Sequence, residues 1–272
     1  MAIKMIAVDM DGTFLDDYSS YNQERFYRIY QILKDRGIRF VVASGNPYLK
    51  LQQCFPEIQK ELTYIAENGG YIMDQGEELF SAHLLPQDSQ LIIDTLKTMP
   101  DVLCWACTKE QSYTLETLPE EYYQMFLPYF PDVKKIKDFK NIEEPIVKFA
   151  LYLPQKNVNE RIHDLTEIVQ QNAKIVDSGH YCVDIIPQNV SKGHAIQILM
   201  DKLQISADEI MAFGDAGNDI EMLQKVKYGY AMENAKDYIK EQFQWIAPSN
   251  NDEGVLEVIK HYLKTDSFYN QK

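Results

Sequence analysis

Residues 5–17 read MIAVDMDGTFLDD, and this stretch decides the fold. A short apolar run at residues 5–8, which is typical of a buried strand, stops at Asp9, and Asp11 follows two residues later. Side chains two residues apart in an extended chain point to the same side, so the two carboxylates would repel each other. A bound cation, or a proton kept on one acid, would relieve that repulsion.

Strand and helix patterns alternate on the amino-terminal side of the chain. Apolar residues at helical spacing over 22–36, followed by Gly37, predict a helix that ends at the glycine. The other elements predicted here are strands at 4–8, 38–43 and 64–67, a helix after Pro47, and a hairpin through Gln75-Gly76. This β-α-β-α-β order predicts a parallel, doubly wound sheet.

The pattern changes at about residue 85. Adjacent strands with short connections predict an antiparallel sheet with helices on one face. The predicted helices are 88–99, 119–130 and 158–171, and the predicted strands are 102–108, 112–116, 146–153, 173–177 and 181–186. Aromatic residues at helical spacing in this region are interpreted as core: Tyr122, Tyr123, Phe126 and Tyr129.

The first pattern returns after residue 187. It predicts helices at 192–203, 217–223, 235–241 and 252–263, strands at 210–213, 228–232 and 245–247, and a frayed tail at 265–272. The predicted fold class is therefore α/β. A doubly wound, Rossmann-like parallel-sheet core, residues 1–84 and 188–272, carries an inserted α+β cap at residues 85–187.

Composition narrows the possible partners. There are 41 Asp plus Glu against 27 Lys plus Arg, a formal net charge of -14, which disfavours binding to nucleic acid or to a membrane surface. A small anionic substrate remains possible, because a local site can oppose the overall field. The chain shows neither a signal-peptide pattern nor a run of membrane-spanning length, and the Cys104/Cys107 pair lies in a predicted strand rather than at a helix start. A reduced, cytoplasmic protein is predicted; the oligomeric state stays open.

Three predicted parallel strands end in polar residues. The first ends in Asp9-Met10-Asp11-Gly12-Thr13, the second in Ser44-Gly45-Asn46, and a later one in residues 214–219, GDAGND. Ligands of doubly wound sheets bind outside the carboxyl ends of the strands, so these three segments should meet in one crevice. Lys192, at the start of a predicted helix, could also reach it.

This set of residues suits phosphoryl transfer. Carboxylates hold Mg²⁺, act as nucleophiles and donate protons, while Ser44, the Gly45 amide and Lys192 can hold phosphate oxygens. Each residue has a plainer interpretation, because Ser44 could be a turn residue, Lys192 a solvated lysine and Asp215 a helix cap. Sequence order and spacing together favour the functional interpretation.

At this point the sequence resembles the haloacid dehalogenase superfamily of phosphohydrolases. The resemblance rests on residues 9–13 (DMDGT), Ser44, Lys192 and residues 214–219. The cap between the Ser44 and Lys192 motifs resembles that of the type-IIB, or Cof-like, branch. Further similarities to that branch are residues 65–70 (IAENGG), 191–193 (SKG), 231–235 (AMENA) and 251–255 (NDEGV).

The resemblance implies a role for each matching residue. Asp9 would attack phosphorus and form an aspartyl-phosphate, and Asp11 would protonate the leaving oxygen and then activate water. Asp9, the Asp11 backbone carbonyl and Asp215 would bind Mg²⁺. The remaining residues would hold the phosphate or support the site: Met10 through its backbone amide, Ser44, Gly45, Lys192, Asn218, Thr13 and Asp219.

The predicted function is a Mg²⁺-dependent phosphatase for a small phosphorylated metabolite, with a sugar phosphate as the class that the resemblance implies. A phosphomutase of the same superfamily and a non-catalytic phosphosugar sensor are the alternatives. Two residues depart from the family pattern. Asn46 stands where many relatives carry arginine, and Glu233 where many carry glycine. Because asparagine is uncharged, the cleft lacks the cation that arginine would place near it. Substrate choice could therefore differ from that of arginine-bearing relatives.

Overall fold

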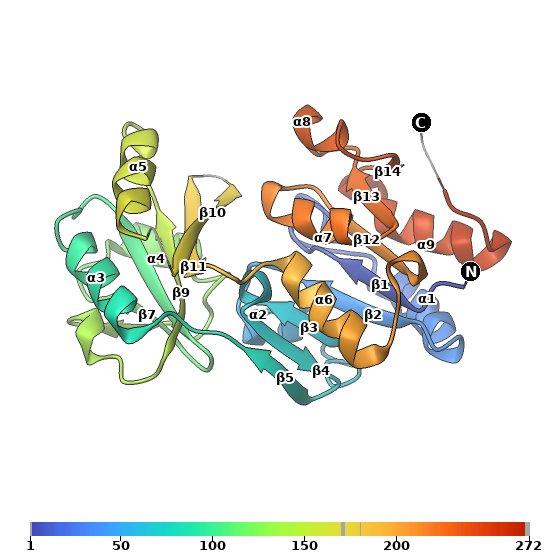
Figure 1. Ribbon diagram of the computed structural model, residues 1–272, viewed down its shortest axis with the longest axis horizontal. Coiled ribbons are helices and arrows are strands. Elements are labelled where there is room, and N and C mark those ends of the chain that lie inside the picture. Colours follow the sequence, from blue (N-terminus) through green and yellow to red (C-terminus); the bar gives the residue numbers. More distant parts are fainter. Residues whose placement is uncertain (1, 170–171, 180, 270–272) are drawn as a thin grey trace.

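The computed structural model describes residues 2–169, 172–179 and 181–269. The chain forms two bodies, each built on its own sheet, and two segments of chain pass between them (Figure 1). We call the body that contains both termini the core and the other body the cap. The predicted boundaries at 84/85 and 187/188 stay a prediction. Within the described residues no helix combines the length and the hydropathy that a membrane span requires.

The core sheet has eight strands in the order β14-β13-β12-β1-β2-β3-β4-β5. Neighbouring strands from β14 to β3 run parallel, whereas β4 and β5 are antiparallel additions. Strand β1 lies in the middle, between β12 and β2, which explains why all four of its residues are apolar and buried. The strands are β1 (Met5–Val8), β2 (Arg39–Ala43), β3 (Thr63–Ala66), β4 (Tyr71–Asp74), β5 (Glu77–Ser81), β12 (Ile210–Gly214), β13 (Tyr228–Met232) and β14 (Trp245–Ala247).

Helices cover both faces of the core sheet, which confirms the predicted doubly wound α/β fold. Alternate residues of β1 face opposite sides: Ile6 packs with the helices of one side and Ala7 with those of the other. The first side carries α1 (Gln23–Asp35), α2 (Tyr48–Cys54) and α9 (Gly254–Thr265). The second carries α6 (Lys192–Leu203), α7 (Ile220–Lys225) and α8 (Asp237–Lys240).

Helix α1 shows how local sequence sets an element. The Asn22 side chain accepts a hydrogen bond from the Arg25 amide and so caps the first turn. Its buried residues recur at helical spacing: Phe26, Ile29, Tyr30 and Leu33. The chain turns out of the helix at Gly37, whose φ of +68° suits glycine.

The cap sheet has six strands in the order β10-β11-β9-β6-β7-β8. Its pairs are antiparallel except for β7 with β8. The cap strands are β6 (Leu103–Thr108), β7 (Ser112–Leu115), β8 (Lys134–Ile136), β9 (Ile146–Tyr152), β10 (Ala173–Gly179) and β11 (Cys182–Pro187), and the cap helices are α3 (Pro86–Leu96), α4 (Glu120–Phe126) and α5 (Val158–Ile168).

The prediction that the cap helices lie on one face of their sheet is wrong. Residues of α3 and α5 pack with Ala106 of β6, whereas aromatic residues of α4 pack with its neighbour Trp105, which points to the opposite face. The large apolar Trp105 side chain on that second face is buried because α4 packs against it. Strand β8 was also not expected, because it is three residues long and carries two lysines.

Other differences concern ends of elements. The predicted helix at 217–223 begins as a 3₁₀ turn, Gly217–Asp219, before α7, and β3 ends one residue early at a second such turn, Glu67–Gly69. The tail is not frayed as far as it is described, because Phe268 stacks on Tyr228, while residues 270–272 lie outside the described residues. The last two residues of the predicted helix 158–171 also lie outside them.

Candidate active site

The carboxyl ends of three adjacent parallel strands bring the predicted motifs together. Val8, the last residue of β1, pairs with Val42 of β2 and with Phe213 of β12. The next residues along each strand are therefore neighbours at one edge of the sheet. Asp9 thus comes to lie between the segments that begin at Ser44 and at Asp215, as the strand order requires.

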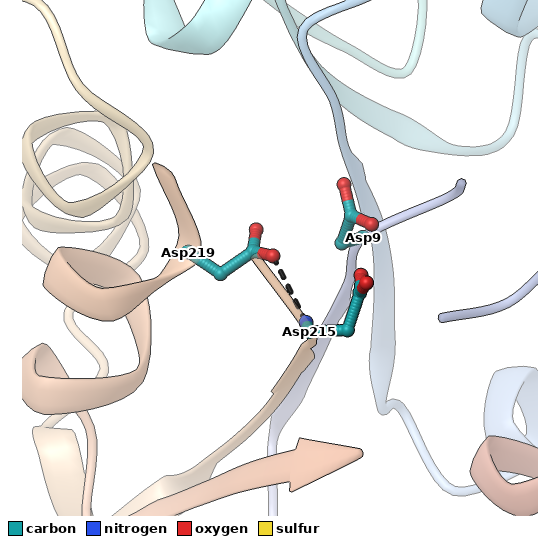
Figure 2. A group of neighbouring side chains, drawn as sticks. All are labelled: Asp9, Asp215 and Asp219. Atoms are coloured by element: carbon teal, nitrogen blue, oxygen red, sulfur yellow. Dashed lines mark hydrogen bonds between the residues drawn. The ribbon is translucent and has the colours of Figure 1, made fainter. Parts of the chain in front are cut away.

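Three carboxylates gather at this edge. Asp9, Asp215 and Asp219 each offer one oxygen, and these oxygens lie within 4.8 Å of one another (Figure 2). Asp219 is fully buried, and its Oδ2 accepts hydrogen bonds of 3.0 Å from the amides of Asp215 and Ala216. The Thr13 hydroxyl donates to Asp215 Oδ1 at 2.9 Å. Their hydrogen bonds therefore hold Asp215 and Asp219 in place.

Lys192 is the cation of the cluster. Ser191 caps the amino end of α6 by accepting a hydrogen bond from the His194 amide, which places Lys192 in the first turn. Its side chain is 1% exposed, and Nζ donates to Asp9 Oδ1 at 2.5 Å and to Asp219 Oδ1 at 2.7 Å. Burial would lower the pKa of Lys192, but the two carboxylates raise it above its usual value. Lys192 therefore stays charged at neutral pH.

The acids outnumber this one cation. Burial raises the pKa of Asp9 well above its usual value, and Asp219 adds to the effect while Lys192 opposes it. Burial, and after it the charge of Asp219, raises the pKa of Asp215 to about 6. Buried carboxylate oxygens that lie close together and carry excess negative charge are a donor set that suits a hard divalent cation such as Mg²⁺.

These pKa shifts predict that the metal-free protein loses stability as pH rises. The folded-state pKa of Asp215 is raised above its value in the unfolded chain, so ionisation costs more in the folded state. The free energy of unfolding should fall between about pH 4 and pH 7, where the group ionises. Denaturant titrations in chelator should show a shallower fall for Asp215→Asn than for the parent.

Added Mg²⁺ provides the matching test. It should raise the parent's melting temperature more at pH 7.5 than at pH 5, since protons compete for the same oxygens. Asp215→Asn should lose most of that increase. Equal pH profiles for parent and variant, with equal responses to Mg²⁺, would show that Asp215 does not hold a metal.

Asp11 lies apart from the three grouped acids. Its side chain is exposed, and its Oδ2 accepts a hydrogen bond of 2.7 Å from Asn46 Nδ2. The next residue, Gly12, has φ +78°, and a Cβ there would stand 2.6 Å from Asp215 Oδ2. A glycine at this turn therefore lets the Asp9 and Asp215 segments approach each other.

The other predicted residues line the same edge. Ser44 is buried, and its Oγ accepts a hydrogen bond of 3.0 Å from the Asn46 amide, which closes the turn that contains Gly45. The Met10 side chain is buried in the core, so its backbone is the part available to a ligand. Asn218 Nδ2 donates to Asn68 Oδ1 at 3.0 Å and so faces the Glu67–Gly69 turn.

Four charged or polar residues beside the site were missed as site residues: Glu67, Asn68, Lys148 and Asp184. A signal for two of them existed in the sequence. Lys148 interrupts the apolar strand Ile146–Tyr152, and Asp184 interrupts Cys182–Pro187. A charge inside a buried strand requires a partner. Lys148 and Asp184 pair with each other, and both also reach partners on the core.

The cap aromatics also divide in a way that spacing does not predict. Tyr122, Tyr123 and Phe126 pack against the Trp105 cluster, as expected of core residues. Tyr129 is 41% exposed. Burial, and after it the charge of Asp11, raises the pKa of Tyr129, so this cap residue lies within electrostatic reach of Asp11.

Comparison with known proteins decides the family. The sequence profile of the haloacid dehalogenase-like hydrolases matches residues 6–259. The chain belongs to this family. The 5-amino-6-(5-phospho-D-ribitylamino)uracil phosphatase YbjI of Escherichia coli K12 is 38% identical over 271 residues, which cover 100% of both chains.

Solved structures of haloacid dehalogenase-like hydrolases have the same fold as this chain. SMU.1108c of Streptococcus mutans UA159 superposes with a TM-score of 0.92 at 35% identity, over 97% of this chain and 100% of that one. The subclass-IIB sugar phosphatase BT4131 superposes at 0.82 over 95% and 98%, and at 18% identity it shows the fold alone. These findings confirm the predicted superfamily and the predicted enzyme class, a phosphatase. The fold with core and cap is shared with the subclass-IIB structure.

Proposed function

We propose that this haloacid dehalogenase-like hydrolase is a Mg²⁺-dependent phosphatase that cleaves a small phosphorylated metabolite through an aspartyl-phosphate on Asp9. The observation that carries the proposal is the buried cluster in which Asp9 lies within 4.8 Å of Asp215 and Asp219 and contacts Lys192. A carboxylate in this setting is held in place and shielded from bulk water, as a nucleophile requires.

The first half of the proposed reaction transfers the phosphoryl group to the protein. An oxygen of Asp9 attacks phosphorus, the bond from phosphorus to the leaving oxygen breaks, and Asp11 donates its proton to that oxygen. Lys192, the Ser44 hydroxyl and the backbone amides of Met10 and Gly45 hold the phosphate oxygens. A bound Mg²⁺ would neutralise negative charge shared by the phosphate and the carboxylates.

The second half returns the protein to its starting state. Asp11, now ionised, takes a proton from water, whose oxygen attacks phosphorus and releases Asp9 and inorganic phosphate. Asn46 donates to Asp11 Oδ2, so it would help to orient the acid. Asp9, the Asp11 carbonyl and Asp215 would hold Mg²⁺, with Thr13 and Asp219 orienting Asp215 and Lys192 and with Asn218 at the phosphate.

The substrate class is a phosphorylated polyol or sugar. A sugar phosphate follows from the resemblance, and the Escherichia coli relative is named for a phosphoribityl-aminouracil, which is a polyol phosphate joined to a ring. Tyr129 of the cap, 41% exposed and within reach of Asp11, could contact such a leaving group. The net charge of -14 supports a small-molecule substrate rather than a nucleic-acid or membrane partner. A cytoplasmic location is part of the proposal.

Phosphate release from a panel of compounds tests the proposal. We expect turnover of sugar phosphates, of 5-amino-6-(5-phospho-D-ribitylamino)uracil, or of both, with Mg²⁺ and none with chelator. Movement of phosphate between two hydroxyls of one substrate without release would identify the alternative, a phosphomutase. Binding without either reaction would identify a phosphosugar sensor.

A further inference from the structure

A second buried ion cluster lies where the cap sheet meets the core. Its members are Lys148 of β9, Asp184 of β11 and Glu67 of the core, with side chains 4%, 6% and 4% exposed. Lys148 Nζ lies 3.0 Å from Glu67 Oε2 and 3.4 Å from Asp184 Oδ2. Burial would lower the pKa of Lys148, but Asp184 and Glu67 raise it, so the lysine stays charged.

Lys148 also reaches the segment proposed to hold phosphate. Its Nζ donates to the backbone carbonyl of Gly45 at 2.6 Å. A residue of the cap thus holds the peptide group that joins Gly45 to Asn46. A charged donor to a backbone carbonyl, excluded from water, makes a strong hydrogen bond that fixes the peptide plane.

A second path runs from the cap through Asn68. Asp184 Oδ2 accepts a hydrogen bond of 2.8 Å from Asn68 Nδ2, and Asn68 Oδ1 accepts one of 3.0 Å from Asn218 Nδ2. Both ends of the Asn68 amide are therefore used, one by the cap and one by the 217–219 turn next to Asp219. Asn68 thus links Asp184 of the cap to the Asn218 side chain.

The backbone of the Glu67–Gly69 turn is strained. Glu67 and Asn68 have φ of +52° and +56°, a region that non-glycine residues rarely adopt. Hydrogen bonds hold the turn against the phosphate-binding segment: the Asn68 amide donates to the Ser44 carbonyl at 3.1 Å and the Glu67 amide to the Asn46 carbonyl at 3.2 Å. Strain of this kind persists where the surroundings over-determine it, and it gathers at functional sites.

We propose that Lys148 and Asp184 are positioning residues, through which the seated cap orders the phosphate-binding segment 44–46 and the side chain of Asn218. The inference rests on the proposed function, because it deepens the role of the same site. The phosphate site is then complete only while the cap is seated on the core. Neither residue touches Asp9, Lys192 or Asp215 in the contacts described, so metal binding is separate from this effect.

Phosphate affinity separates positioning from mere stabilisation. We would measure the binding of inorganic phosphate in saturating Mg²⁺ and the dissociation constant of Mg²⁺, both by calorimetry, and the melting temperature. Lys148→Met should weaken phosphate binding about tenfold or more, by loss of a charge-assisted hydrogen bond. Asn68→Gly, which keeps the left-handed backbone without strain, should weaken phosphate binding about fivefold. Both variants should keep the parent's dissociation constant for Mg²⁺.

The matched control is Arg39→Met. Arg39 pairs with Asp74 at 2.6 Å at the opposite end of β2 from Ser44, so its loss should lower the melting temperature without changing phosphate affinity. Should Lys148→Met fail to fold, Lys148→Met with Glu67→Gln removes one charge of each sign and leaves the net charge of the cluster unchanged. That double variant should still bind phosphate about tenfold more weakly.

Parent-like phosphate affinity in both Asn68→Gly and a folded Lys148 variant would overturn the positioning role. Calorimetry needs no turnover, so this result is independent of the catalytic proposal. A parent that binds phosphate but hydrolyses nothing would contradict the proposed function. The phosphate affinities of parent and variants could still be compared. If the parent hydrolyses phosphate esters but the variants bind phosphate as tightly as the parent does, the positioning role alone would be contradicted.

Discussion

Asp9→Asn is expected to abolish turnover while the protein stays folded. Asparagine keeps the shape of the side chain but cannot form the phosphorylated intermediate, so kcat should fall about 10⁴-fold or more. Burial already disfavours the ionised form of Asp9, as its raised pKa shows. The melting temperature in chelator should therefore be at least that of the parent. Stopped-flow hydrolysis of p-nitrophenyl phosphate with Mg²⁺ measures the loss.

Asp11→Asn is the matched control for Asp9→Asn. Nitrophenolate leaves without a proton, so the first half-reaction should survive in Asp11→Asn while hydrolysis of the intermediate stalls. That variant should release a burst of one nitrophenolate per protein chain and then slow, whereas Asp9→Asn should show no burst. Hydrolysis by Asp9→Asn within tenfold of the parent would show that Asp9 is not the nucleophile.

Lys192→Met is expected to give the largest loss of stability. The lysine is buried against Asp9 and Asp219, and its removal leaves these carboxylates without their cation. Breaking a buried ion pair on one side costs about 3–5 kcal/mol in the free energy of unfolding. The loss should be larger at pH 8 than at pH 5, because the remaining acids have raised pKa values and protonation relieves their repulsion.

Urea titrations of the metal-free protein at the two pH values measure this effect. Lys34→Met serves as the control, because Lys34 pairs with Glu61 at 2.8 Å while both side chains are about half exposed. Its substitution should change stability by no more than about 1 kcal/mol. A loss for Lys192→Met no larger than that of the control, or one that does not depend on pH, would contradict the electrostatic account of the site.

The core fold was predictable because its signals are local. The buried run of β1, the helix cap at Asn22 and the turn at Gly37 each depend on a few neighbouring residues. The parallel order then follows from the alternation of elements, and it brings strand-end residues together. Asp9, Ser44 and Asp215 could be placed at one edge on this ground alone.

The cap was less predictable. The side on which α4 packs depends on Trp105, and nothing in the α4 sequence identifies that partner. The tail resembles a polar, frayed segment, yet Phe268 stacks on Tyr228 from a distant strand. Tyr129 has the spacing of its packed neighbours but is 41% exposed, and the charge of Asp11 contributes to its raised pKa. For α4 and for the tail, the deciding contact joins segments far apart in the chain.

The sequence by itself determined the doubly wound core, the inserted cap and the family to which the motifs belong. These depend on short-range patterns and on the rule that parallel strands end at a common edge. Only the tertiary structure decided that Asp219 joins Asp9 and Asp215, and that Lys148 and Asp184 of the cap reach Gly45 and Asn68 of the core. Buried charges require partners, but the sequence does not identify them. For Lys148 and Asp184, packing of the cap sheet on the core brings those partners within hydrogen-bonding distance.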